Sequence, residues 1–135
     1  MFVLDASTAL SWAFPDESSE TADIAWRLLR DDSAAVPGVW WFELRNILLL
    51  GERHGRIGAE RVESFLTTLS SQPIVFPPRP SDKAIFAVAR RWKLTIYDAA
   101  YLELAQRLKA PLATLDRRLA QAAEGAGVRL IRRDS

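Results

Sequence analysis

The chain has 135 residues, a length that suits one domain and leaves no comfortable room for two, so we predict a single domain over residues 1–135. Apolar residues make up 49% and charged residues 26%, which excludes an intrinsically disordered chain, and the net charge of +1 excludes a uniformly cationic coat for nucleic acid. With no cysteine and one histidine, His54, the sequence also excludes disulfide scaffolds, thiolate metal sites and His-rich zinc sites, which leaves carboxylates for most catalytic work.

Strand and helix patterns alternate along the chain. Short apolar runs bounded by breakers predict five buried strands, at residues 2–4, 34–36, 74–76, 112–115 and 128–131. Helical periodicity predicts helices at residues 18–30, 39–50, 59–69, 81–92, 98–108 and 117–124. Such alternation predicts an α/β fold with a central parallel sheet and helices on both faces. The helix at residues 39–50 is apolar nearly all round, so we expect it to be buried.

No segment of the sequence suggests a membrane or export signal. The longest apolar runs, such as residues 47–50, fall far short of the roughly 20 residues that cross a bilayer. The chain reaches Asp5 without a basic region or an apolar run of signal-peptide length. We therefore expect a cytoplasmic protein with no membrane partner.

Most of the 17 acidic residues lie in helix starts, turns or polar helix faces, where they are expected to be solvated. Glu103 is among them, on the polar side of its predicted helix. Four acids do not fit this description because each sits in an apolar context or directly after a strand: Asp5, Glu43, Asp98 and Asp116. Asp5, Asp98 and Asp116 also fit helix caps, whereas Glu43 lies inside its helix and does not.

The expected positions of these acids point to a ligand site. Asp5 and Asp116 follow predicted strands, and ligands of open α/β sheets bind at the carboxyl ends of the strands. Clustered carboxylates repel one another unless a cation lies between them, and oxygen-only ligation suits Mg²⁺ or Mn²⁺. A metal held in this way activates water and stabilises charge on a phosphoryl oxygen. The residues alone therefore predict a metal-dependent phosphohydrolase or phosphotransfer site.

At this point the ordered set of acids matches a known family. The sequence resembles the PIN-domain nucleases, and most closely the VapC-type toxins of toxin–antitoxin pairs, over residues 2 to about 130. The resemblance rests on four segments: FVLDAST with Asp5, FELRN with Glu43 and Asn46, YDAAYLELA with Asp98, and ATLDRRL with Thr114 and Asp116. It implies a three-layer α/β/α domain with a central parallel sheet, and an endoribonuclease that uses Mg²⁺ or Mn²⁺.

The resemblance also implies roles for individual residues. The four acids would bind the metal directly or through water, and the hydroxyls of Ser7 and Thr114 would orient them. Asn46 lies one helical turn after Glu43, so we expect either a hydrogen bond to that carboxylate or a polar group satisfied within its helix. The substrate class would be transfer or ribosomal RNA, and the partners a VapB-like antitoxin and a second copy of the chain.

Basic and aromatic residues suggest where such partners bind. Arg117 and Arg118 follow Asp116 at an expected helix start, which favours anions, and Arg45 lies two residues from Glu43, so these three are candidates for RNA phosphate contacts. A solvated helix face is the ordinary alternative for each. Core packing is the ordinary interpretation of the abundant aromatic residues. The alternative is an exposed surface near Trp12, Phe14, Trp26 and Trp40, which we expect an antitoxin segment to cross while it places an arginine among the acids.

Two other functions remain open at the level of sequence. One is a PIN-domain nuclease of RNA processing that is not a toxin. The other is a catalytically silent α/β binding module in which the acids serve as helix caps.

Overall fold

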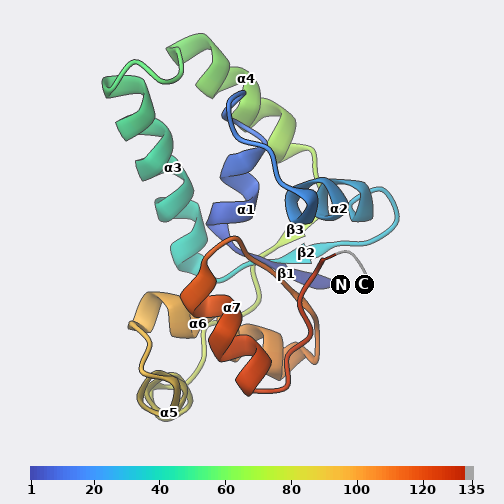
Figure 1. The fold of residues 1–135 in the computed structure, drawn as a ribbon, viewed down its shortest axis with the longest axis vertical. Coiled ribbons are helices and arrows are strands. Elements are labelled where there is room, and N and C mark those ends of the chain that lie inside the picture. The colour runs from blue at the N-terminus through green and yellow to red at the C-terminus, as the bar shows by residue number, and fades with distance from the viewer. Residues whose placement is uncertain (133–135) are drawn as a thin grey trace.

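The sheet has four short parallel strands in a computed structural model that describes residues 1–132; residues 133–135 of the predicted domain lie outside the described part. The strands are β1 (Phe2–Leu4), β2 (Ala34–Ala35), β3 (Ile74–Val75) and β4 (Leu112–Ala113). Their order is β3-β2-β1-β4, and every pair is parallel. β1 therefore lies in the interior of the sheet, where its three residues are fully buried, and its carboxyl end lies beside that of β4 (Figure 1).

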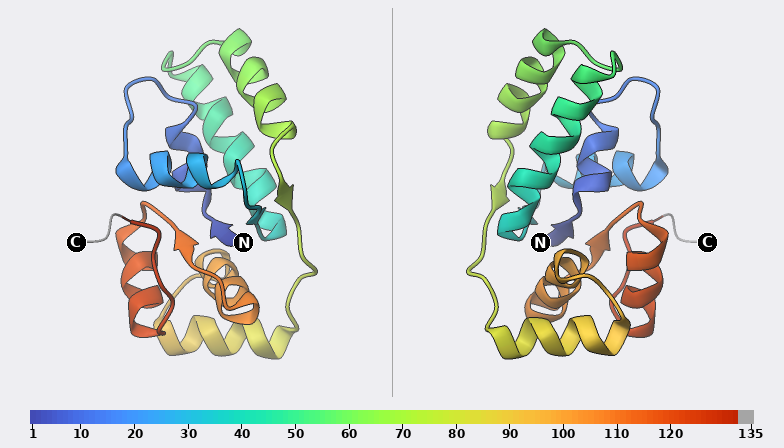
Figure 2. Two further views of the ribbon diagram at one scale, coloured as in Figure 1. Left: turned by 90° about the vertical axis from the view of Figure 1, so that its right-hand side faces the viewer. Right: turned by 90° about the vertical axis from the view of Figure 1, so that its left-hand side faces the viewer.

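Seven helices surround this sheet in the described part of the chain. They are α1 (Ala6–Ser11), α2 (Glu20–Leu28), α3 (Gly38–Arg53), α4 (Ala59–Ser70), α5 (Asp82–Trp92), α6 (Ile96–Leu108) and α7 (Arg117–Gly125). Figure 2 shows α1 to α4 on one side of the strands and α5 to α7 on the other. The predicted α/β/α fold with a central parallel sheet is confirmed.

Several element boundaries differ from the prediction. The fifth strand, expected at residues 128–131, is reduced to one parallel bridge between Leu130 and Leu112. Helix α6 was expected to open at Asp98 but begins at Ile96, because Thr95 is its N-cap and accepts a hydrogen bond from the Asp98 backbone N–H at 3.1 Å. Asp98 is therefore a residue of the first helical turn and not its cap.

Helix α3 contradicts the expectation that it is buried. Only one stripe faces the core, formed by Trp40, Leu44, Leu48 and Gly51. Phe42 is 69% exposed, and Trp41, Ile47, Leu49 and Leu50 are also exposed. The reason is its position at the periphery, where α3 and α4 form a hairpin that projects from the sheet (Figure 1), so much of the opposite face of the helix stays exposed in the described part of the chain.

Glu103 also departs from the prediction, because it is buried and not solvated. Its two carboxylate oxygens accept hydrogen bonds from Nε and Nη2 of Arg107, at 2.9 and 3.0 Å. Arg107 in turn donates from Nη1 to the carbonyl oxygen of Pro78 at 2.8 Å. The pair thus ties the proline-rich connector before α5 to α6, and the ion pair explains how a charged group is tolerated there.

Among residues 1–132, no helix combines the length and the apolar character needed to cross a membrane.

Candidate active site

Asp5 lies where β1 ends and α1 begins. Its side chain is only 7% exposed, and its Oδ2 accepts hydrogen bonds from the hydroxyls of Ser7 at 2.8 Å and Thr114 at 2.6 Å. Although Asp5 holds the N-cap position of α1, its side chain makes no capping hydrogen bond. The cap interpretation is therefore wrong for Asp5, and its carboxylate is held by Ser7 in the first turn of α1 and by Thr114 directly after β4.

The two hydroxyls are themselves oriented by the backbone after β4. Ser7 Oγ accepts from the N–H of Leu115 at 3.0 Å, and Thr114 Oγ1 accepts from the N–H of Asp116 at 3.0 Å. Because each hydroxyl has one hydrogen and its oxygen already receives a donor, that hydrogen is directed at the carboxylate. This arrangement fixes Asp5 relative to the loop that carries Asp116.

Asp116 is both a helix cap and a member of this neighbourhood. Its Oδ1 accepts from the backbone N–H of Leu119 at 3.0 Å, so the cap interpretation holds for this residue. The negative charge of Asp116 nevertheless raises the pKa of both Asp5 and Asp98. A cap that uses one carboxylate oxygen leaves the other available.

Glu43 projects from α3 and is bound by a residue that the sequence did not single out. The hydroxyl of Tyr101 donates to Oε1 of Glu43 at 2.6 Å, across a separation of 58 residues. Tyr101 is fully buried and lies on α6, three residues after Asp98. The segment YDAAYLELA contained one signal for it, because residues three apart share a face of a helix.

The four acids act on one another electrostatically. Burial is the main cause that raises the pKa of Asp5, Glu43 and Asp98 above their ordinary values. Neighbouring carboxylates raise them further: Asp116 acts on Asp5, Asp5 and Asp98 act on Glu43, and Asp116 and Asp5 act on Asp98. The fold therefore brings together side chains that are up to 111 positions apart in the sequence, from 5 to 116.

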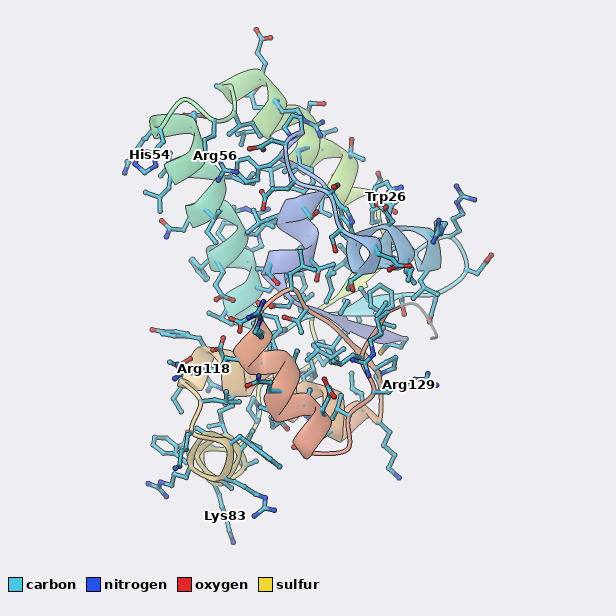
Figure 3. All side chains as sticks on the ribbon, viewed as in Figure 1. Trp26, His54, Arg56, Lys83, Arg118 and Arg129 are labelled. Atoms are coloured by element: carbon cyan, nitrogen blue, oxygen red, sulfur yellow. The ribbon has the colours of Figure 1, made fainter. Side chains whose placement is uncertain are left out.

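Little positive charge offsets this concentration of acids. None of the four acids takes part in an ion pair within the described residues 1–132. Arg118 is the one cation that lowers the pKa of Asp98, and Figure 3 shows it at the start of α7 beside α6. The donor set consists of carboxylate and hydroxyl oxygens, which fits a hard divalent cation.

The acids do not, however, form a closed metal cage as they stand. In residues 1–132, no three His, Asp or Glu side chains converge closely enough to hold an ion. The donor chemistry fits Mg²⁺ or Mn²⁺, and Mg²⁺ usually keeps several of its waters and needs few direct carboxylate ligands.

Two predicted residues lie away from the acids. Asn46 is exposed and makes no hydrogen bond to Glu43, whose carboxylate is bound by Tyr101. Arg45 turns toward a separate pocket of about 180 Å³, where its guanidinium lies 3.8 Å from the centre of the Trp41 ring.

Arg117 is exposed at the start of α7. His54 is the C-cap of α3 and is exposed at the far tip of the hairpin (Figure 3).

An aromatic groove of about 450 Å³ lies between α1, α2 and α4. Trp12 and Trp26 line it in an edge-to-face contact, with 5.0 Å between their ring centres, together with Arg61 and Phe65. The expected aromatic surface is therefore only partly correct, because Phe14 is buried in the core and Trp40 packs against Phe76 elsewhere. Trp12 follows the last residue of α1, so the groove lies about 10 Å along that helix from Asp5.

Comparison with known families matches residues 2–125 to the PIN domain. Among curated proteins, the chain is 33% identical over 127 residues to Ribonuclease VapC3 of Pyrobaculum aerophilum, a match that covers 88% of this chain and 92% of that protein.

Three solved structures share the fold. The structure of PAE2754 from Pyrobaculum aerophilum gives a TM-score of 0.72 at 23% identity and covers 90% of this chain and 83% of that one. A toxin–antitoxin complex from Klebsiella pneumoniae gives 0.58 at 16% identity, covering 83% of each chain. VapC20 of Mycobacterium tuberculosis, described as a sarcin–ricin loop cleaving toxin, gives 0.65 at 12% identity, covering 98% of this chain and 100% of that one.

Proposed function

The chain belongs to the PIN-domain family, and from that premise we propose that it is an endoribonuclease dependent on Mg²⁺ or Mn²⁺ and the toxin of a type II toxin–antitoxin pair. The observation that carries this proposal is the gathering of four carboxylates: Asp5 follows β1, Asp116 follows β4, and Glu43 and Asp98 project from α3 and α6. Their mutual charges raise the pKa values of Asp5, Glu43 and Asp98. Carboxylates without cationic partners in a half-buried site destabilise the folded protein. Their presence is explained if the site binds a cation.

The metal ligands in this proposal are the four acids, some of them acting through water. A bound divalent ion would supply Lewis-acid chemistry that activates water and stabilises a phosphoryl oxygen. The chain's own contribution is to hold Asp5 in one orientation through Ser7 and Thr114 and to gather the remaining carboxylates around it.

Positioning of the RNA backbone falls to the start of α7. Arg118 lies close enough to Asp98 to lower the pKa of that carboxyl, and the amino-terminal end of a helix such as α7 attracts anions. We assign Arg118, with Arg117 beside it, to RNA phosphate contacts that fix register without reading sequence. One structural relative is described as cleaving the sarcin–ricin loop, which supports structured RNA, such as ribosomal or transfer RNA, as the substrate class.

The proposed partners are an antitoxin and a second copy of the chain. The groove lined by Trp12 and Trp26 has the apolar walls that an amphipathic segment of an antitoxin needs, and it lies one short helix away from Asp5. From there a cationic side chain of the antitoxin would reach the acids. The exposed face of α3 that carries Phe42 and Leu49 is the surface we assign to a homodimer. We propose that the whole chain acts as one domain in the cytoplasm.

Cleavage of purified transfer and ribosomal RNA tests the function. We expect new 5′-phosphate ends with Mg²⁺ or Mn²⁺, poor activity with Ca²⁺, which is a weaker Lewis acid with looser coordination, and none in excess EDTA.

Variants of the acids test the site. Alanine at Asp5, Glu43, Asp98 or Asp116 should each lower the cleavage rate by more than the roughly 10–100-fold typical of residues that only support a ligand. Glu63→Ala on α4 is the matched control, because Glu63 is exposed and distant in sequence from the other four. A folded variant with full activity would remove that acid from the site. Cleavage that persists in EDTA would contradict the metal-dependent mechanism.

A further inference from the structure

Tyr101 has a buried hydroxyl in direct contact with a candidate metal ligand, and the proposed function assigns it no role. It is fully buried on α6, and its hydroxyl donates to Glu43 Oε1 at 2.6 Å. This distance falls within the range for a hydroxyl that donates to a carboxylate, which is a charge-assisted hydrogen bond.

The contact joins two elements that otherwise supply one acid each. Glu43 comes from α3 and Asp98 from α6, and Tyr101 lies three residues after Asp98 on the same helix. Since residues three apart lie on the same face of a helix, Asp98 and the Tyr101 ring project toward the same region. A single rigid helix therefore carries one acid and the donor that holds another.

Glu43 has no other side chain to fix it within the described part of the chain. Its Oε1 is bound by Tyr101, and Asn46, the expected partner on its own helix, is exposed and not bound to it. A glutamate has three rotatable side-chain bonds, so without a partner its carboxylate would occupy several rotamers. Tyr101 restricts that freedom and leaves Oε2 available.

We propose that Tyr101 is a positioning residue that holds the Glu43 carboxylate toward Asp5 and Asp98, so that it is oriented for the metal before the metal binds. The inference rests on the proposed function, because it assigns Glu43 to metal binding. Tyr101 would then support Glu43 in the way that Ser7 and Thr114 support Asp5.

The electrostatics of Tyr101 agree with a permanent donor. Burial, followed by the charge of Asp5 and the hydrogen bond to Glu43, raises the pKa of the phenol far above its ordinary value. A phenol with a raised pKa keeps its proton near neutral pH, so the hydroxyl can act as a donor there. The same hydrogen bond lowers the pKa of Glu43 and so opposes the effect of burial on that carboxyl.

The test compares Tyr101→Phe, which removes one oxygen atom, with Tyr97→Phe. Tyr97 lies on the same helix but is 61% exposed, so it receives the same chemical change without a role in the site. Mn²⁺ binding to the full chain is measured by electron paramagnetic resonance, which counts the free ion without any RNA present. We expect Tyr101→Phe to weaken Mn²⁺ binding about 10-fold and to lower kcat by about 10–100-fold with little change in KM for RNA.

A double-variant cycle separates positioning from a general structural role. If Tyr101 acts through Glu43, then Tyr101→Phe added to Glu43→Gln has no further effect on Mn²⁺ binding beyond that of Glu43→Gln alone. Equal Mn²⁺ binding by Tyr101→Phe and Tyr97→Phe would overturn the proposal, as would fully additive losses in the double variant. If the chain cleaves no RNA, the proposed function fails, whereas the binding measurements still decide the role of Tyr101.

A second measurement keeps the test decisive if Tyr101→Phe does not fold. The sequence has only two tyrosines, so 3-fluorotyrosine labelling gives two fluorine signals, which the Tyr97→Phe variant assigns. Titration with Mg²⁺ should shift the Tyr101 signal in the intact chain and should leave it unmoved in Glu43→Gln. A Tyr101 signal that does not respond to Mg²⁺ in the intact chain would contradict the proposal.

Discussion

At Asp5, burial and hydrogen bonding act on one carboxyl in opposite directions. Burial raises its pKa, the hydroxyls of Thr114 and Ser7 lower it, and the charge of Asp116 raises it again, with a net increase above the ordinary value of 3.8. The charged form of this residue is therefore destabilised in the native state relative to the unfolded chain. Without a bound metal, the charge of Asp5 therefore lowers the free energy of unfolding of the protein.

This balance predicts how stability depends on pH. From pH 3.8 up to the raised native pKa, the unfolded chain loses the Asp5 proton while the native state keeps it, so the free energy of unfolding falls as pH rises. Asp5→Asn has no carboxyl group to titrate at this position, so it avoids this decrease in the free energy of unfolding. In EDTA at pH 7 we expect Asp5→Asn to melt about 3–6 °C above the natural chain, a shift that corresponds to about 1 kcal/mol in a domain of this size.

The difference between the two melting temperatures should shrink as the pH is lowered toward 4. Added Mn²⁺ should raise the melting temperature of the natural chain and should have little effect on the variant, because a ligand stabilises only the state that binds it. Lower stability of Asp5→Asn at pH 7 in EDTA would show that its hydrogen bonds outweigh the cost of its charge.

At the scale of elements, the α3–α4 hairpin depends on a close contact at Gly51. A Cβ atom at this position would lie 2.8 Å from two carbons of the Phe14 ring, which is itself buried and covered by the Arg56 guanidinium at 4.4 Å. The ring therefore has little freedom to move aside. Gly51 allows α3 to approach the segment after α1 closely enough to exclude water.

Gly51→Ala should consequently destabilise the protein. Overpacking of a filled core costs about 1–3 kcal/mol, and the better helix propensity of alanine offsets less than about 1 kcal/mol of that. Gly38→Ala is the matched control at the start of the same helix, since a Cβ there meets nothing within 4 Å. Denaturant unfolding should place the midpoint of Gly51→Ala below that of Gly38→Ala. A Gly51→Ala midpoint at or above the control would mean that Phe14 moves without cost.

The same elements explain what the sequence could and could not predict. Strand and helix positions follow from local periodicity, and the four acids stood out because apolar neighbours make an unexplained carboxylate conspicuous. The Tyr101–Glu43 contact was missed because it depends on how α3 and α6 approach each other across 58 residues. The exposure of α3 was missed because composition alone does not distinguish a central helix from a peripheral one with an unpaired apolar face.

For the whole molecule, the distance between the aromatic groove and the acids sets what a partner must do. A segment seated on Trp12 and Trp26 occupies one end of α1, and Asp5 lies at the other end. Inhibition therefore requires the partner to bind the groove and also to extend along α1 to the carboxylates. Binding and inhibition become separable properties.

Variants of the groove and of the partner should separate them. Trp26→Ala should weaken antitoxin binding by about 10-fold or more, because Trp26 lines the groove. Without antitoxin, the variant should cleave RNA at the normal rate, because Trp26 does not support the acids. Trp41→Ala is the control, an exposed aromatic residue outside the groove.

Removal of the antitoxin arginine that reaches the acids should restore cleavage with most of the binding retained. A complex that is bound at the groove, contains the arginine and is fully active would contradict inhibition by occlusion. Titration calorimetry and a cleavage assay measure the two properties.

The division of the acids along the chain has a consequence during protein synthesis. Asp5 and Glu43 come from elements before the proline-rich connector that Arg107 holds, and Asp98 and Asp116 come from elements after it. A ribosome must therefore translate past residue 116, and the segment must leave the exit tunnel, before all four carboxylates can meet. Under the proposed function, a nascent chain cannot attack the RNA of the ribosome that is making it, and a product of premature termination before Asp116 is harmless to the cell.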